Sequence, residues 1–274
     1  MARSGTTGGL HYEVHEGPAG ADTVILSSGL GGLGAFWQPQ MAALTARFDV
    51  VLYDHRGAGR STRTLTDPHS VDAMADDIVA VMDGLDLPSA HVVGHAAGGL
   101  AGLSLALRYP DRMERLVVVN GWSRPDPHIA RCFKARTSLL KDSGPAAYIS
   151  AQPIFLYPAN WISRNAALLE AEEPHMVAGF PGREVMLARI AALLAFDIDA
   201  RLPDIKAPVL VSASADDMLA PVLCAQRLAK RLPNATLDIA PWGGHAFTVT
   251  AAAAFNKTLV AYLRAEPLPP SAED

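Results

Sequence analysis

Three groups along the chain could together perform hydrolytic chemistry, and the first is a turn that lacks its reactive side chain. Residues 92–99 read Val-Val-Gly-His-Ala-Ala-Gly-Gly, an apolar strand followed by small residues and the start of a helix. This spacing matches the G-x-S-x-G pattern, in which a sharp turn exposes a nucleophilic serine. Ala96 occupies the nucleophile position, and its methyl group cannot attack a substrate. A covalent intermediate on residue 96 is therefore excluded.

An acid and a base follow this turn in the chain order nucleophile, acid, histidine. Asp217, next to Asp216, follows an apolar segment at 209–213, and His245 lies in a glycine turn after the apolar segment 235–240. We predict that His245 is a general base and that Asp217 orients it. Asp216 is expected to be a helix cap or a solvated neighbour. A structural role is the alternative for both His245 and the aspartates.

Two turns could supply backbone donors for a developing negative charge. Residues 28–32 read Ser-Gly-Leu-Gly-Gly, and glycine allows a sharp turn and close approach of the backbone to a ligand. Leu30 and Ala97 are the expected oxyanion-hole N–H donors, with Gly29 beside the substrate. The helix expected from Ala97 adds a favourable dipole. The alternative is that 28–32 is only a tight turn.

Alternating strands and helices are expected to position these groups. Short apolar segments predict strands, and longer segments with helical periodicity predict helices between them. This alternation indicates an α/β fold with a mainly parallel central sheet and helices on both faces. The predicted strands are 10–15 (an edge strand), 23–28, 49–54, 90–94, 115–120, 207–214 and 235–240, and the predicted helices are 34–47, 70–85, 97–109, 222–231 and 251–263.

The alternation stops after Trp122. Residues 123–206 contain no convincing Val- or Ile-rich strand, only helix-like runs such as 129–141 and 183–195 separated by prolines. We interpret this region as a helical cap inserted between strands of a core made of residues 1–122 and 207–274.

Composition restricts the ligand and the compartment. The 274 residues carry a formal net charge of -5, which gives no electrostatic reason to expect nucleic acid or an anionic membrane as a partner. A small molecule is the expected partner, and a homodimer is one option for the oligomeric state. Cys132 and Cys224 lack metal-binding spacing, so neither a metal nor another cofactor is expected. A cytoplasmic location is expected because the N-terminus lacks a signal-peptide pattern.

The absent nucleophile also restricts the substrate. Removing the nucleophile of a triad protease costs about six orders of magnitude, yet about 10³ to 10⁴ over water remains from the oxyanion hole and binding. A stable ester or amide would therefore turn over too slowly. A substrate that already decomposes in water needs only a positioned water and a base. Loss of the serine side chain at position 96 leaves room for that water.

Five segments make the chain resemble the α/β-hydrolase fold and, within it, the pyrimidine-utilisation protein D family of the Rut uracil-degradation pathway. They are 94–98, 120–122, 131–133, 243–246 and, above all, the cap segment AQPIFLYPANW at 151–161. Members of this family can carry alanine at the nucleophile position of the turn, here residue 96, and this turn is called the elbow below. The resemblance implies a hydrolase that acts on a C–N bond other than a peptide bond. Its substrate would be an unstable product of uracil ring opening, either aminoacrylate or carbamate.

Both substrates suit a base without a nucleophile, and both carry a carboxylate. We hypothesise that His245 activates a water near Ala96 without a covalent intermediate. Arginine can hold a carboxylate through two hydrogen bonds, and Arg131, Lys134 and Arg136 lie on a predicted helix that borders the site. A solvated helix face is the alternative for these cations.

Three further residues are weaker candidates for substrate binding. His95 adjoins the elbow, while Tyr157 and Trp161 lie in the cap segment. The alternative is that His95 packs beneath the elbow and that the two aromatic rings pack within the cap.

Three other functions remain open on the sequence alone. A serine esterase or lactonase captured as a Ser-to-Ala variant at position 96 would be revealed by the unmodified gene sequence. A cofactor-free oxygenase could use the His-Asp pair to deprotonate an aromatic substrate, and it would consume oxygen. A non-catalytic binding protein would bind a small molecule without accelerating its decay. The fold alone does not choose among them.

Overall fold

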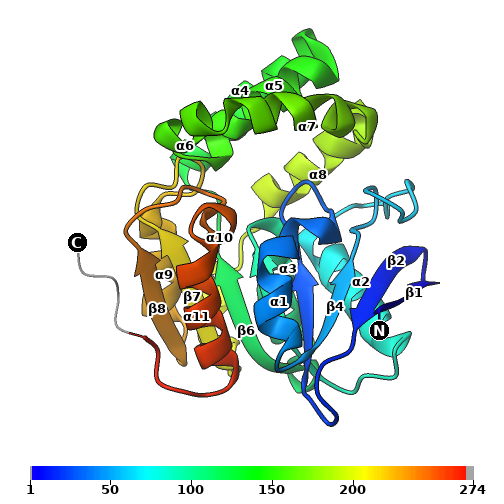
Figure 1. The fold of residues 1–274 in the computed structure, drawn as a ribbon, viewed down its shortest axis with the longest axis vertical. Coiled ribbons are helices and arrows are strands. Elements are labelled where there is room, and N and C mark those ends of the chain that lie inside the picture. Colours follow the sequence, from blue (N-terminus) through cyan, green and yellow to red (C-terminus); the bar gives the residue numbers. More distant parts are fainter. Residues whose placement is uncertain (1, 270–274) are drawn as a thin grey trace.

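A mostly parallel sheet forms the centre of the protein in the computed structural model, which describes residues 2–269 (Figure 1). The β1–β2 and β2–β4 pairs are antiparallel, and every other pair is parallel, which confirms the predicted α/β fold. In spatial order the strands are β1 (Ala2–Thr7), β2 (Leu10–His15), β4 (Asp49–Tyr53), β3 (Thr23–Ser27), β5 (Ala90–His95), β6 (Met113–Val119), β7 (Val209–Ser214) and β8 (Ala235–Ala240).

Helices cover both faces of the sheet. Alternate residues of each strand point to opposite faces, so Val92 packs with the α2 and α3 side while Val93 packs with the α1 and α11 side. Both valines are buried, as expected for a parallel strand between two layers. One face carries the short 3-10 helix η1 (Gly34–Trp37), α1 (Gln38–Thr45) and α11 (Ala252–Leu263), and the other carries α2 (Val71–Asp83), α3 (Ala97–Arg108) and α9 (Val222–Arg231).

The strands at the two edges of the sheet are β1 and β8, so the prediction that 10–15 forms an edge strand is wrong. β1 reads Ala-Arg-Ser-Gly-Thr-Thr and lacks the apolar alternation that marks a strand. It pairs with β2 through a two-residue turn at Gly8 and Gly9, both with positive φ. This Gly-Gly pair is typical of a two-residue hairpin turn and is the sequence signal for the β1–β2 hairpin.

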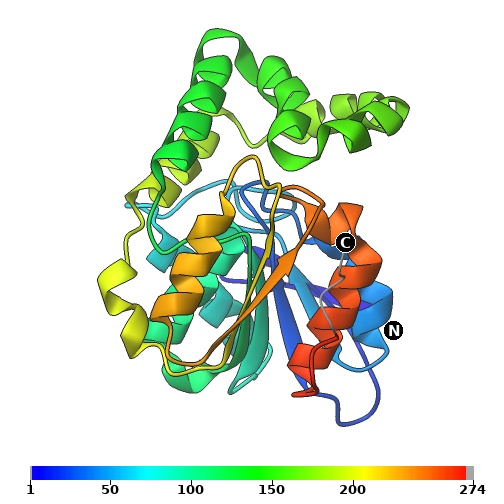
Figure 2. The ribbon, with the colours of Figure 1, turned by 90° about the vertical axis from the view of Figure 1, so that its left-hand side faces the viewer.

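Five helices between β6 and β7 lie over the carboxyl ends of the parallel strands (Figures 1 and 2). Pro153 and Pro174 lie inside α5 and α7, so the expectation that prolines separate the helices is wrong at these two positions. No helix within 2–269 is long and apolar enough to cross a membrane. Residues 270–274 of the predicted core lie outside the described residues. The five helices are α4 (Pro127–Asp142), α5 (Gly144–Leu156), α6 (Ala159–Arg164), α7 (Ala166–Ala178) and α8 (Arg183–Ala195).

The five helices α4 to α8 are called the cap below. Short elements connect the cap and the helices of the core to the strands. η3 (Asp199–Asp204) precedes β7 and packs against α9. α10 (Phe247–Thr250) follows the His245 turn and leads into α11, and η2 (Pro110–Arg112) joins α3 to β6.

Candidate active site

The turn between β5 and α3 has a strained backbone although it carries no nucleophile. Ala96 has φ 45° and ψ −109°, a conformation that side chains other than glycine rarely adopt. Its N–H donates to the Val119 carbonyl at 2.8 Å, and its own carbonyl accepts from Leu100 N at 2.9 Å. The residue is 5% exposed. The sharp strand-to-helix turn of a nucleophile elbow is therefore present, with a methyl group at its apex.

His245 and Asp217 meet as a hydrogen-bonded pair. His245 Nδ1 lies 2.7 Å from Asp217 Oδ2, and the two side chains are 2% and 0% exposed. The other carboxylate oxygen accepts the backbone N–H groups of Leu219 and Ala220 at 2.7 and 2.9 Å. These bonds fix the carboxylate, so the proton of the neutral imidazole is held on Nδ1. Nε2 makes no hydrogen bond within the described part of the chain and is free to act as a base.

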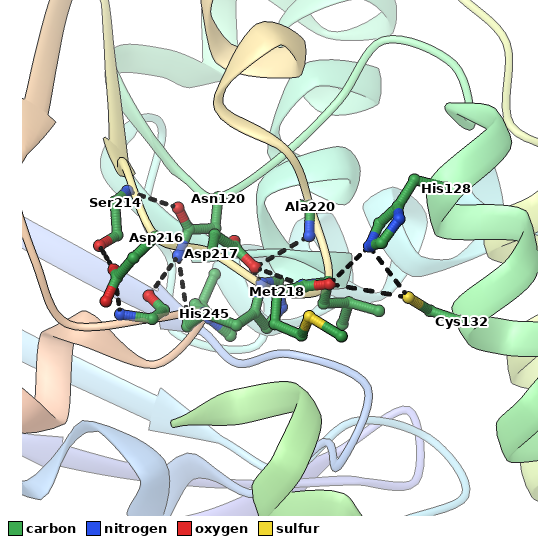
Figure 3. A network of polar contacts seen from close by, with 12 residues as sticks. Asn120, His128, Cys132, Ser214, Asp216, Asp217, Met218, Ala220 and His245 are labelled. Atoms are coloured by element: carbon green, nitrogen blue, oxygen red, sulfur yellow. Dashed lines mark hydrogen bonds and ion pairs between the residues drawn. The ribbon is translucent and has the colours of Figure 1, made fainter. Parts of the chain in front are cut away.

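Asn120 links the acid turn to the base turn, a role that the sequence analysis did not assign. Figure 3 shows it between Ser214 and His245. Its Oδ1 accepts Ser214 N at 3.1 Å, and its Nδ2 donates to the His245 carbonyl at 2.7 Å. Asn120 has φ 49°, which asparagine tolerates better than most residues. An asparagine directly after a buried strand was the available signal.

Asp216 is a solvated neighbour of the pair and not a helix cap. Its Oδ1 accepts Ser214 Oγ at 2.6 Å and Gly244 N at 2.8 Å (Figure 3). The residue is exposed, and α9 begins after Pro221 without a side-chain cap. Asp216 therefore ties the acid turn to the glycine turn that carries His245.

His95 supports the His245 turn from below. Its Nε2 lies 2.8 Å from the His245 carbonyl, which can only accept, so Nε2 carries the proton. Burial lowers the pKa of His95 to about 3, so the ring is neutral. Nδ1 has no partner among residues 2–269 and faces Gly29, where a Cβ would lie 2.7 Å away. This geometry favours the packing alternative for His95 and explains why Gly29 has no side chain.

The predicted oxyanion donors belong to two turns that contact each other. A Cβ on Gly98 would overlap the Ser27 carbonyl, so the start of α3 packs directly on the end of β3. Ala97 is the first residue of α3, where backbone N–H groups have no partner within the helix. Leu30 lies in a turn closed by a hydrogen bond from Gly32 N to Gly29 O at 2.9 Å. Among the described residues, neither the Leu30 N–H nor the Ala97 N–H donates a backbone hydrogen bond in a turn or loop.

The three predicted cations of α4 differ in their exposure to solvent. Arg136 is 4% exposed, and its Nη2 lies 2.6 Å from Tyr148 Oη and 3.3 Å from Gln152 Oε1. Its Nε is buried without a hydrogen-bond partner among the described residues. Arg131 and Lys134 are exposed, so the structure does not bring them to this cluster.

The cap segment that resembles the Rut family rests on the base turn. Ala246 N donates to the Leu156 carbonyl at 2.9 Å. Tyr157 and Trp161 stack with ring centroids 4.4 Å apart at the turn between α5 and α6. Burial raises the pKa of Tyr157. The two rings therefore pack against each other near the site, in agreement with the packing alternative.

The Cys132 thiol lies near the acid turn, and it is not activated. Its Sγ lies 3.3 Å from His128 Nε2, but that nitrogen donates to the Met218 carbonyl at 2.7 Å (Figure 3). Burial raises the pKa of the Cys132 thiol, which disfavours the thiolate. Within 2–269 no group of three or more His, Cys, Asp or Glu side chains could hold a metal.

Comparisons with known proteins identify relatives of this chain by sequence and by fold. Residues 22–149 match the family described as alpha/beta hydrolase fold. A protein of Caulobacter sp. strain K31, named "Putative carbamate hydrolase RutD", is 68% identical over 96% of this chain and 99% of its own length. A protein of the same name from Variovorax paradoxus is 54% identical over 93% of this chain and 96% of its own. An enol-lactonase structure from Burkholderia xenovorans LB400 has a TM-score of 0.86 and 28% identity, and covers 96% of this chain and 100% of its own.

Proposed function

We propose a reaction for this hydrolase from the premise that the chain belongs to the α/β-hydrolase fold family and, within it, to the family of its RutD relatives. The proposed reaction is hydrolysis of a small, unstable carboxylate from pyrimidine breakdown, either carbamate or aminoacrylate. The observation that carries the proposal is the buried His245–Asp217 pair, 2.7 Å apart, beside an elbow with alanine at its apex. A base is present, and the usual nucleophile is not.

Water takes the place of the nucleophile in this proposal. His245 Nε2 removes a proton from a water near Ala96, and the water oxygen bonds to the substrate carbon. With carbamate the C–N bond then breaks, the nitrogen leaves as ammonia with the proton from His245, and bicarbonate remains. With aminoacrylate the water adds to the imine carbon of the imine tautomer, and loss of ammonia leaves an aldehyde group on the same carboxylic acid. Both steps balance without an external oxidant or reductant.

Two sets of donors match the charge of such a substrate. The N–H groups of Leu30 and Ala97 can hold the oxygen on which negative charge develops. Arg136 Nε is buried and has no hydrogen-bond partner within 2–269, and an arginine can hold a carboxylate through a planar pair of donors. We therefore assign the substrate carboxylate to Arg136. Its buried location favours this role over a role for Arg131.

The test of the proposal measures ammonia release from freshly generated carbamate and aminoacrylate against a no-protein control. The wild-type chain should accelerate one of them, and His245→Gln should lose about 10² to 10⁴ of that acceleration because glutamine cannot act as a base. His175→Gln, on the exposed surface of α7, is the matched control and should behave like the wild type.

Three results would contradict the proposal. A fully active His245→Gln variant would exclude the water mechanism. Tight binding of both compounds without acceleration would indicate a binding protein. Oxygen uptake during turnover would indicate an oxygenase.

A further inference from the structure

Arg189 is a buried cation of the cap whose hydrogen bonds reach into the core. It lies on α8 and is 2% exposed. Nη1 donates to the Arg56 carbonyl at 2.7 Å, and Nη2 donates to the Leu30 carbonyl at 3.0 Å. Nη2 also lies 3.1 Å from His55 Nδ1. None of its hydrogen bonds within the described residues goes to a carboxylate.

One of these bonds holds the turn that carries a predicted oxyanion donor. Three carbonyl groups of the 28–32 turn have fixed partners. Gly32 N donates to the Gly29 carbonyl at 2.9 Å, and His55 N donates to the Gly32 carbonyl at 2.7 Å. Arg189 holds the Leu30 carbonyl, and of the three donors it alone comes from the cap. Together these bonds fix the peptide planes on both sides of Leu30, including the plane of its N–H.

A second bond reaches the strand that leads into this turn. His55 Nδ1 accepts from Arg189, so His55 Nε2 carries the ring proton and donates to Ser27 Oγ at 3.1 Å. Burial holds the pKa of His55 well below its ordinary value, which keeps the ring neutral. Ser27 Oγ is also 2.8 Å from Tyr53 Oη. Arg189 therefore supports the last residue of β3 as well as the turn after it.

Stability alone is a poor reason for this arrangement. A buried guanidinium that lacks a carboxylate partner pays a desolvation cost, and buried ion clusters can often be replaced by apolar residues without loss of stability. Burial lowers the pKa of Arg189 to about 10, which reflects that cost. A methionine at this position could fill much of the same volume. What methionine could not do is hold three acceptors on two core loops.

We propose that Arg189 is a positioning residue that, from the cap, holds the 28–32 turn in the orientation in which the Leu30 N–H faces the substrate oxygen. This inference rests on the proposed function, because that function makes Leu30 an oxyanion donor. Arg189 itself need not touch the substrate, since its Nη donors are engaged with Leu30, Arg56 and His55.

The kinetic test uses Arg189→Met and Arg189→Lys in the full chain. A misplaced oxyanion donor reduces the binding of the transition state more than the binding of the substrate. The value of kcat should therefore fall about 10- to 10²-fold, while KM changes less than about threefold. Arg189→Lys should not restore kcat, because the single nitrogen of an ammonium group cannot occupy the positions of both Nη1 and Nη2. If Arg189→Met does not fold, Arg189→Lys gives the same comparison. Arg183→Met, on the exposed side of α8, is the matched control.

A second measurement follows the turn without using activity. Hydrogen–deuterium exchange should accelerate in a peptide covering 28–34 of Arg189→Met and stay unchanged in a peptide covering α3. Arg183→Met should exchange like the wild type in both.

The two measurements separate this inference from the proposed function. An unchanged kcat in folded Arg189→Met, or a higher KM with an unchanged kcat, would overturn the inference. If the wild type accelerates neither substrate, the proposed function fails, and exchange then decides the positioning role. Faster exchange confined to 28–34 would support that role, and unchanged exchange would refute it.

Discussion

At the scale of single residues, Ala96 has the strained backbone conformation of a nucleophile elbow, although its methyl side chain cannot act as a nucleophile. A residue with positive φ other than glycine costs of the order of 1–3 kcal/mol unless its surroundings impose it. Here the surroundings are the Val119 carbonyl, which accepts from Ala96 N, and the packing of Gly98 on the end of β3. The strained turn aims the N–H of Ala97 and starts α3. Its presence without a nucleophile is consistent with the proposed site, in which the Ala97 N–H binds the substrate and a water takes the place of the nucleophile.

Ala96→Ser tests whether the elbow still points at the base. The new hydroxyl should be activated by His245, so the variant should be labelled by an organophosphate and should hydrolyse p-nitrophenyl acetate at least about 10²-fold faster than the wild type. Its activity on the proposed substrate should fall because the hydroxyl occupies the place of the water. Mass spectrometry of the labelled protein measures the covalent step.

The control for this experiment is the double variant Ala96→Ser, His245→Gln. Without the base it should not be labelled. If folded Ala96→Ser itself resists labelling, residue 96 does not face His245, and the proposed water position would be wrong.

At the scale of elements, the sequence predicts the bounds of the buried strands most accurately and the individual helices of the cap least accurately. Val-rich segments such as 115–120 lie between layers, and burial on both faces gives them an unmistakable apolar run. The cap helices α6 and α7 bury no residue, so they lack the apolar stripe that reveals a helix. Asn120 offers only its place after a buried strand as a signal, and Arg189 offers none, because the partners of both lie on distant segments that the tertiary fold brings together.

The helical phase of α4 decides which of its cations can reach a ligand. Cys132 and Arg136 are four residues apart and share the buried face, while Arg131 is exposed. Arg136→Met should raise KM about 10- to 10²-fold with a smaller effect on kcat, since a hydrogen bond to a charged group contributes about 1.5–3 kcal/mol.

Arg131→Met is the matched control on the same helix and should keep the wild-type KM. Arg136→Lys retains the charge but not the planar pair of donors, so its KM should lie between those of the wild type and Arg136→Met. A raised KM in Arg131→Met with a normal KM in Arg136→Met would reverse the assignment. Steady-state kinetics of ammonia release measures all three variants.

At the scale of the whole molecule, the fold encloses several neutral imidazoles. Burial lowers the pKa of His95 to about 3 and that of His69 to about 4, and it also lowers the pKa values of His55 and His91. Two carboxyl groups have the opposite effect on the pH dependence of stability, because burial raises the pKa of Asp77 and of Asp238. Between about pH 6.5 and pH 5.5 histidines take up protons in the unfolded chain, so the histidine contribution to stability changes in this window, and a histidine variant compared with the wild type isolates it.

The free energy of unfolding should therefore fall as the pH drops through this window. In the unfolded chain a histidine takes up a proton at about pH 6.5, whereas the buried His95 of the folded chain does not. The unfolded state therefore binds more protons, and acidification stabilises it relative to the folded state. His95→Gln keeps a donor for the His245 carbonyl but cannot titrate, so its decline should be smaller by up to about 1.4 kcal/mol per pH unit. Urea unfolding at pH 6.5 and 5.5 measures both proteins, and the interval from pH 7.5 to 8.5 is the internal control. Equal declines in the two proteins would show that His95 is protonated in the folded state, and the ring could then no longer be a neutral support beneath the base.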